Sequence, residues 1–275
     1  MAESRSHLKS RSVIELTPLE EYYNKFNEDK RLCSRRGQVE FRTAVFFIEK
    51  CIGSLGKTAD QVRILDVGAG TGAYSIPLAK KGYSVTAVEP VAHNLGRLKA
   101  KSEKVEAFRG DARNLRKFSD ASFDLVLLFG PMYHVHDTLE KKKCLLEAKR
   151  VVRPGGFILV SYFMNDYCVL RYGFAEGNIL SELNSGHIDE KYHITENANP
   201  LYSYVRLEDI DALNEACGLS RFAIVSQDGL SSLIRQSLRE MSDEMFEEYM
   251  RYHLSVCERA DMLGFAAHLL DMIRV

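Results

Sequence analysis

The stretch that most constrains the fold of this chain is ILDVGAGTGAY, Ile64–Tyr74. The apolar run VRILDVG has the length of a buried strand, and AYSIPLAKKG after it has the pattern of a short helix that ends at Gly82. Gly68, Gly70 and Gly72 lie in the turn between them. Glycines let a ligand approach the backbone closely, and a helix start offers unpaired N–H groups. The stretch therefore predicts a strand–turn–helix unit that can hold a dinucleotide, another nucleoside cofactor, or no ligand.

The same alternation of strand and helix continues along the chain. Strand and helix patterns follow one another in YSVTAVEP, AHNLGRLKAKS, VEAFRGDAR, FDLVLLFGPMYHV, TLEKKKCLLEAKRVV and FILVSYF. Pro90 stops the second strand, and RPGG ends the helix before the fifth. Strands and helices that alternate at this spacing predict right-handed crossovers and a parallel sheet. The fold class is therefore α/β, with a doubly wound, Rossmann-like sheet.

Helices are expected before the first strand. Residues 1–12 are polar and predict a disordered tail. Thr17 can cap a helix, Pro18 suits its first position, and Glu20 completes a capping box. Residues 37–52 carry apolar side chains at helical spacing, so two helices are predicted ahead of the sheet, within an N-terminal helical cap over residues 13–60.

The alternation stops after the fifth strand. Residues 164–204 are rich in tyrosine, glycine and asparagine and show only weak helical stretches. A long irregular insertion at the carboxyl edge of a parallel sheet is typical of a lid or a substrate pocket. A helix, a strand, a helical region over 230–265 and a last strand, AHLLDMIRV, follow. We expect one domain over residues 13–275.

Charge and cysteine usage exclude several classes of protein. The chain has 37 basic and 38 acidic residues, and its net charge of -1 gives no case for a nucleic-acid or membrane partner. The six cysteines form no CxxC pair, which argues against a zinc or redox site and for buried thiols in a reducing compartment, with no metal expected. No apolar run is long enough to span a bilayer, and the N-terminus lacks the apolar centre of a secretory signal. These features predict a cytoplasmic protein.

Asp66 indicates which of the possible ligands the glycine turn binds. Gly68, Gly70 and Ala73 fit a relaxed dinucleotide fingerprint, GxGxxG/A, but this match is weak by itself. A carboxylate at the strand end would face the negative charges of a pyrophosphate, whereas it would favour an amino or sulfonium cation. The sign of the charge therefore favours a cationic ligand.

Two further acids follow the next strands. Glu89 closes the second strand, 21 residues after Gly68, where a carboxylate can accept both hydroxyls of a ribose. Asp111 follows the third strand and can accept from the amino group of adenine, with Ala112 offering its backbone N–H. Acids at the ends of three successive strands predict a nucleoside site.

The segments LDVGAGTG, VTAVEP, RGDAR, FDLVLLFGPMYH and RVVRPGG together resemble the successive motifs of the class I S-adenosylmethionine-dependent methyltransferases. The resemblance covers about residues 62–163 strongly and the terminal helix–strand–helix–strand segment more loosely. It implies a seven-stranded, mostly parallel sheet whose last strand is antiparallel and inserted beside the sixth. It also implies S-adenosyl-L-methionine as cofactor and S-adenosyl-L-homocysteine as product. The glycine loop then holds the methionine part, Glu89 the ribose, and Asp111 with Ala112 the adenine, while FGPMYH crosses the reactive end.

Methyl transfer from a sulfonium is an in-line displacement that depends mainly on holding the acceptor in place. His134 and His136 follow the fourth strand, where a neutral imidazole can take a proton from the acceptor, and Tyr133 can form a pocket wall. We take His134 as the catalytic candidate, and Tyr133, His136 and Tyr167 as the substrate candidates. The candidate cofactor-binding residues are Tyr23, Arg36, Asp66, Gly68, Ala69, Gly70, Gly72, Glu89, Pro90, Asp111, Ala112 and Phe129.

Tyr23 and Arg36 are included because in related small-molecule methyltransferases an N-terminal helix folds over the cofactor. Arg36 could then meet the methionine carboxylate with its planar fork. Where methylases of nucleobase amino groups show an Asn- or Asp-Pro-Pro-aromatic turn, this chain has GPMY, so a small-molecule acceptor, methylated on O, N or C, is favoured over a nucleic acid. An RNA or protein methyltransferase stays an alternative. A cofactor-binding regulator without turnover and a nicotinamide oxidoreductase remain as alternatives. A monomer or a homodimer is expected.

Overall fold

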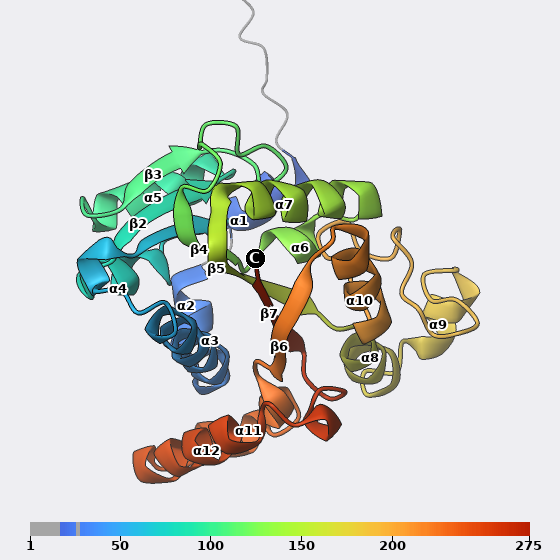
Figure 1. The fold of residues 1–275 in the computed structure, drawn as a ribbon. Helices are drawn as coiled ribbons and strands as arrows, with labels where there is room; N and C mark the ends of the chain where they lie inside the picture. The colour runs from blue at the N-terminus through green and yellow to red at the C-terminus, as the bar shows by residue number, and fades with distance from the viewer. Residues whose placement is uncertain (1–16, 26–27) are drawn as a thin grey trace, which may run out of the picture.

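The computed structural model describes residues 17–25 and 28–275, and the predicted disordered tail, residues 1–12, lies outside them. The strands form one seven-stranded sheet with the order β3-β2-β1-β4-β5-β7-β6 (Figure 1). Only β7 is antiparallel, and it pairs with both β5 and β6. The predicted sheet is confirmed, including the insertion of its last strand beside the sixth. The strands are β1 Arg63–Val67, β2 Ser84–Glu89, β3 Glu106–Arg109, β4 Phe123–Leu128, β5 Val152–Phe163, β6 Ser220–Ser226 and β7 His268–Arg274.

The sheet is covered by helices on both faces because its central strands are apolar on both sides. Ile64 and Leu125 belong to one core cluster, which includes residues of α3 (Arg35–Gly53), α4 and α5. Leu65 and Val126 belong to the other, which includes residues of α7 and α10. Alternate residues of each strand therefore point to opposite helical layers. The helices around the sheet are α4 Ser75–Lys80, α5 Ala92–Lys101, α6 Pro131–His134, α7 Thr138–Val151 and α10 Leu207–Ala216.

Three α-helices, not two, precede β1 in the described part of the chain: α1 Pro18–Lys25, α2 Glu28–Cys33 and α3 Arg35–Gly53. The capping box of α1 forms as predicted between Thr17 and Glu20. The chain turns at Ser34, whose side chain caps α3 by accepting from the Gly37 amide. A Cβ atom on Gly37 would lie 2.3 Å from the carbonyl oxygen of Arg31. Only glycine therefore allows α2 and α3 to approach so closely.

The insertion after β5 forms small helices, α8 Asn165–Cys168 and α9 Ile179–Asn184, with a π-helical turn at Val169–Phe174 between them. It lies at the side of the molecule opposite β2 and β3 (Figure 1). The helical region predicted at 230–265 is divided into α11 Arg235–Glu240 and α12 Asp243–Val256, because Ser242 caps a new helix.

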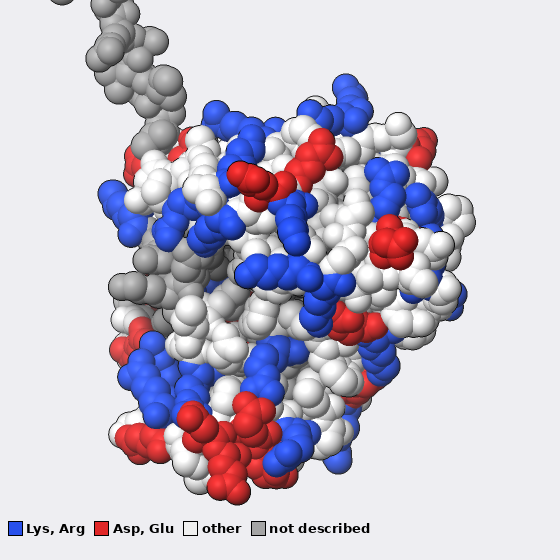
Figure 2. Space-filling view, turned by 90° about the vertical axis from the view of Figure 1, so that its left-hand side faces the viewer, with Lys and Arg blue, Asp and Glu red and all other residues white. Residues whose placement is uncertain are grey.

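The surface carries both signs of charge. Figure 2 shows lysine and arginine side chains spread over one face, with acidic side chains between them and gathered near its lower edge. None of the helices within residues 17–25 and 28–275 is long and apolar enough to cross a membrane. Five of the six cysteines are buried: Cys51, Cys144, Cys168, Cys217 and Cys257.

Candidate functional site

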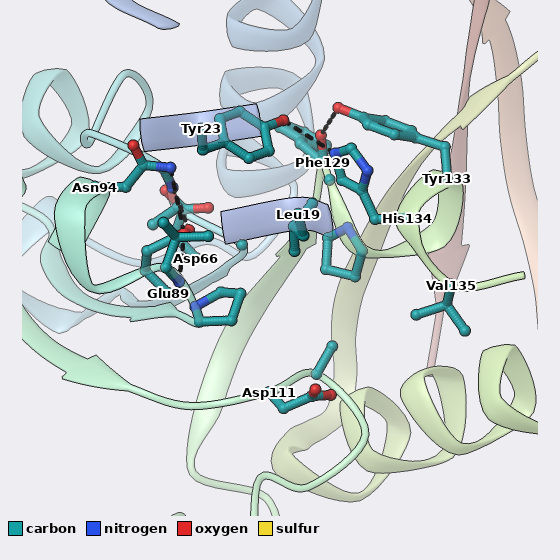
Figure 3. Close-up of a pocket in the computed structure, with 18 of the residues that line it drawn as sticks. Leu19, Tyr23, Asp66, Glu89, Asn94, Asp111, Phe129, Tyr133, His134 and Val135 are labelled. Atoms are coloured by element: carbon teal, nitrogen blue, oxygen red, sulfur yellow. Dashed lines mark hydrogen bonds between the residues drawn. The ribbon is translucent and has the colours of Figure 1, made fainter. Parts of the chain in front are cut away.

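A cavity of about 350 Å³ lies where β1, β2 and β4 end, and α1 contributes to its wall (Figure 3). Most of the predicted site residues line it together: Tyr23, Asp66, Gly68, Ala69, Gly70, Glu89, Pro90, Asp111, Ala112, Phe129, Tyr133, His134 and His136. The wall does not include Gly72, Arg36 or Tyr167. It does include Leu19, Arg31, Thr71, Tyr74, Asn94 and Val135, which the sequence reasoning did not select.

The glycine turn after β1 requires left-handed backbone. Gly68 has φ 77° and Gly70 has φ 57°, a region that other residues rarely adopt. A Cβ atom on Gly68 would lie 2.8 Å from Cδ of Pro131, so the turns after β1 and β4 touch at this point. Gly72, with φ 88°, faces Ile76 and Leu98 instead of the cavity. Its role in the structure is to let α4 and α5 pack closely.

Asp66 is a buried carboxyl at the end of β1, on the cavity wall. Its Oδ2 accepts a hydrogen bond from Oγ of Ser75, at 2.5 Å. Burial raises the pKa of Asp66 to about 6, and the bonds from Ser75 only partly oppose this. Among the described residues no cation forms an ion pair with it. A cationic ligand in the cavity would therefore stabilise its ionised form.

Glu89, at the end of β2, is bound to the glycine turn. Its Oε2 accepts from the Gly70 amide at 2.8 Å, and its Oε1 accepts from the Val91 amide at 3.0 Å and from Nδ2 of Asn94 at 3.4 Å (Figure 3). Burial raises the pKa of Glu89, while these hydrogen bonds favour its charged form. Because a carboxylate has about four lone-pair sites, Glu89 keeps one for a ligand hydroxyl.

Asp111 lies apart from Asp66 and Glu89, in the loop after β3 (Figure 3). The Arg113 guanidinium binds both of its carboxylate oxygens, at 2.8 and 2.5 Å, and lowers the pKa of Asp111. Asp111 is therefore an anionic acceptor at neutral pH. Ala112 lines the cavity beside it, so the predicted pair is brought together.

His134 is hydrogen bonded through both ring nitrogens. Nδ1 lies 2.8 Å from the carbonyl oxygen of Leu201, in the insertion. Nε2 lies 3.0 Å from the hydroxyl of Tyr23 (Figure 3). Since a carbonyl only accepts, we assign the proton to Nδ1, and Nε2 accepts from Tyr23. Burial lowers the pKa of His134 to about 4, so the ring is neutral. His134 thus joins α1 to the insertion.

Aromatic rings continue from His134 toward the insertion. The Tyr133 hydroxyl donates to the Phe129 carbonyl at 2.5 Å, and the Tyr133 ring lies 6.4 Å from the rings of both Phe163 and Tyr202. Tyr167 packs on Phe163 at 6.3 Å, away from the cavity wall. Tyr133 and Tyr167 therefore belong to one aromatic cluster, but only Tyr133 faces the cavity.

His136 differs from His134 because, in the described part of the chain, neither of its ring nitrogens has a hydrogen-bond partner. Both nitrogens are shielded from solvent. The ring lines the cavity described above and also a second cavity beside it. His136 therefore lies between the two cavities.

Arg31 occupies the place at the wall that was expected for Arg36. Its Nη1 donates to both carboxylate oxygens of Glu40, at 3.0 and 2.7 Å, and the nearby guanidinium holds the pKa of Glu40 at about 2. Arg36 lies on α3 and donates to Oγ of Ser232 at 3.0 Å. The chain turn at Ser34 separates the two arginines. The motif CSRRG contains this cap signal, which could have pointed to Arg31.

Residues 65–160 match the family model described as "Methyltransferase domain". A curated relative, demethylmenaquinone methyltransferase of Renibacterium salmoninarum, is 39% identical over 104 residues, which are 37% of this chain and 41% of the relative. Ubiquinone biosynthesis O-methyltransferase of Rickettsia akari is 25% identical over 171 residues, 60% of this chain and 64% of the relative. The chain thus spans less than two thirds of either relative.

The whole fold is similar to that of solved methyltransferases. A SAM-dependent methyltransferase from Thermotoga maritima superposes with a TM-score of 0.57 at 18% identity, covering 93% of this chain and 97% of the other. At this identity the likeness concerns the fold alone. It agrees with the sheet order and with the position of the cavity at the carboxyl ends of the parallel strands.

Proposed function

We propose that this chain, a member of the class I S-adenosylmethionine-dependent methyltransferases, moves the methyl group of S-adenosyl-L-methionine to O, N or C of a small molecule. The observation that carries the proposal is the buried carboxyl of Asp66, which lines the cavity without an ion-pair partner in the described residues. A dinucleotide phosphate beside this carboxylate would be repelled, whereas an ammonium or sulfonium group would be attracted.

The residues around the cavity fit the parts of this cofactor. The glycine turn and Asp66 suit the methionine part, and Glu89 suits the ribose, since one lone-pair site remains on its carboxylate. Asp111 and the Ala112 amide suit the amino group and ring of adenine. We extend the proposal to Arg31, which lines the cavity and whose guanidinium can meet the methionine carboxylate in place of Arg36.

When bound, the cofactor supplies an electrophilic methyl carbon, and the chain has to align an acceptor with it. We place the acceptor beside Tyr133 and His136, on the side of the insertion. His134 is occupied at both nitrogens, so we assign it a positioning role: it holds Tyr23, and with it α1, over the cavity. Tyr167 supports the aromatic cluster behind Tyr133.

The proposal is tested by incubating the protein with methyl-tritiated S-adenosyl-L-methionine and metabolite extracts, then separating small molecules from macromolecules. A labelled small molecule is expected. Demethylated quinones belong among the pure acceptors tried, because the two curated relatives are named for quinone methylation. Label in RNA or protein would support the alternative acceptors, and tight cofactor binding without any transfer would support a regulator.

We further propose that residues 13–275 form one domain, with residues 13–60 as a cap and residues 164–204 as the lid over the acceptor. Two contacts support this: the hydroxyl of Tyr202 in the insertion lies 3.3 Å from that of Tyr22 in the cap, and the Leu201 carbonyl binds His134 on the cavity wall. A cytoplasmic location and a monomeric or dimeric state also remain proposals. Fractionation and size-exclusion chromatography with light scattering test them.

A further inference from the structure

A second cavity, of about 270 Å³, lies beside the first between α7, α10 and the end of the insertion. His136 lines both cavities, so the second space begins where the proposed cofactor cavity ends. Its most unusual wall residue is Lys141, on α7, which is only 4% exposed. Lysine is almost never so deeply buried unless its charge is paired.

The ammonium group of Lys141 has one hydrogen bond and no ion pair among the described side chains. Its Nζ donates to Oγ of Ser203 at 2.6 Å. An ammonium has three donors, so two remain for other acceptors. Among the side chains that the structure describes, those of residues 17–25 and 31–275, no carboxylate forms an ion pair with Lys141. Burial lowers the pKa of Lys141, and the more distant Asp209, Glu196 and Asp137 oppose this. A buried ammonium in this state is stabilised most by an anion that reaches it directly.

The charges around the cavity restrict that anion. Lys141 and Lys142 line the wall, and so do Glu196 and Asp209, which makes the lining balanced in sign. A group with one negative charge can bind at Lys141 and adds little negative charge near Glu196 and Asp209. A phosphate dianion would face stronger repulsion from them. The oxygens of Glu196 can accept from a hydroxyl or an ammonium on the same molecule.

We propose that Lys141 binds the carboxylate of the methyl acceptor, so that the acceptor is a small carboxylic acid. This inference rests on the proposed function, because it takes the first cavity as the site of the methyl donor. The acceptor lies with its carboxylate in the second cavity and its reacting atom past His136, toward the first. Lys141 acts by binding the acceptor and takes no part in a covalent step.

Benzoate, and benzamide as its uncharged counterpart, probe the site without knowledge of the acceptor. Calorimetry on the full chain, with and without saturating S-adenosylhomocysteine, should show benzoate binding at least tenfold more tightly than benzamide. Lys141→Met should remove this preference. Lys143→Met is the matched control, because Lys143 lies on the same helix but is exposed and paired with Glu140, and it should leave the preference unchanged.

Equal binding of benzoate and benzamide by the wild-type protein, or a preference that survives Lys141→Met, would overturn the inference, and so would inorganic phosphate binding more tightly than benzoate. Lys141→Met should also melt at or above the wild-type temperature, since it removes an unpaired buried charge. If it does not fold, Lys141→Gln keeps a donor for Ser203 and should lose the preference likewise. Normal binding of S-adenosylhomocysteine with no benzoate site would contradict this inference alone, whereas absent S-adenosylhomocysteine binding would contradict the proposed function.

Discussion

The hydroxyl of Tyr23, in the first helix, donates to Nε2 of His134, 111 residues further along the chain, at 3.0 Å. This contact holds α1 over the cavity, because both side chains line it. Tyr23→Phe should remove a neutral hydrogen bond, which usually contributes about 1 kcal/mol. S-adenosylhomocysteine binding should therefore weaken about fivefold. Calorimetry measures this, with the half-exposed Tyr252→Phe as control. A loss of the same size in both variants would argue against the role of the contact.

The carboxyl of Asp66 should make stability fall as pH rises. Its folded pKa is about 6, whereas an unfolded aspartate titrates near 3.9. Between about pH 4 and pH 6 the unfolded chain binds fewer protons than the folded one, so the free energy of unfolding decreases. Asp66→Asn keeps an oxygen for the Ser75 hydroxyl and removes this cost. The free energy of unfolding of Asp66→Asn should exceed that of the wild type by up to about 3 kcal/mol at pH 7.5, and by little at pH 4. Urea denaturation at the two pH values measures this difference.

Cofactor affinity should have the opposite pH dependence. A cation in the cavity favours the ionised form of Asp66, so binding of S-adenosyl-L-methionine should release protons below about pH 6. The affinity should rise between pH 5 and pH 7 and level off above. Titrations in buffers of different ionisation enthalpy count the protons. Proton uptake on binding in this range would contradict the charge argument.

Gly68 and Gly96 offer a matched pair of substitutions. Gly68 has positive φ, and a Cβ atom there would meet Pro131, so Gly68→Ala should destabilise the fold by about 1–3 kcal/mol and weaken S-adenosylhomocysteine binding. Gly96 lies inside α5 with nothing within 4 Å of its Cβ position. Gly96→Ala should stabilise the protein by about 0.5–1 kcal/mol. Denaturation curves for the two variants should therefore move in opposite directions.

The roles of Arg31 and Arg36 can be distinguished with a ligand that lacks the carboxylate of the methionine part. Arg31→Lys keeps the charge beside Glu40 but loses the planar guanidinium. It should reduce the free energy of S-adenosylhomocysteine binding by about 1.5 kcal/mol, roughly tenfold in affinity. The affinity for 5′-methylthioadenosine, which has no carboxylate, should change little. Arg36→Lys should affect neither ligand. If Arg36→Lys alone reduces S-adenosylhomocysteine binding, the assignment to Arg31 is wrong.

The strand-end acids could be predicted from the sequence because their positions follow from local order. Parallel strands bring their carboxyl ends to one edge of the sheet, so Asp66, Glu89 and Asp111 had to line one cavity, with Asp111 apart from the other two. The choice between Arg31 and Arg36 depended on the chain turn at Ser34, where the close approach at Gly37 changes the direction of the helix. The spacing of apolar residues alone does not predict this turn between α2 and α3.

Contacts between distant segments were beyond sequence reasoning. The tautomer of His134 depends on the Leu201 carbonyl, 67 residues away in an insertion with no regular pattern. Lys141 belongs to a run of three lysines that reads as a solvated helix face, yet Ser203 from the same insertion covers it. Both features arise from the path of residues 164–204, which no local periodicity determines.

Calorimetric titration with S-adenosylhomocysteine tests the central claim most directly, using wild type, Asp66→Ala and Glu89→Ala, and NAD as a comparison ligand. We expect the wild type to bind S-adenosylhomocysteine and not NAD, and each variant to lose at least about 1.5 kcal/mol of binding free energy, as for hydrogen bonds to a charged group. Unchanged affinity in both variants with the fold intact, or tight NAD binding without S-adenosylhomocysteine binding, would contradict the account.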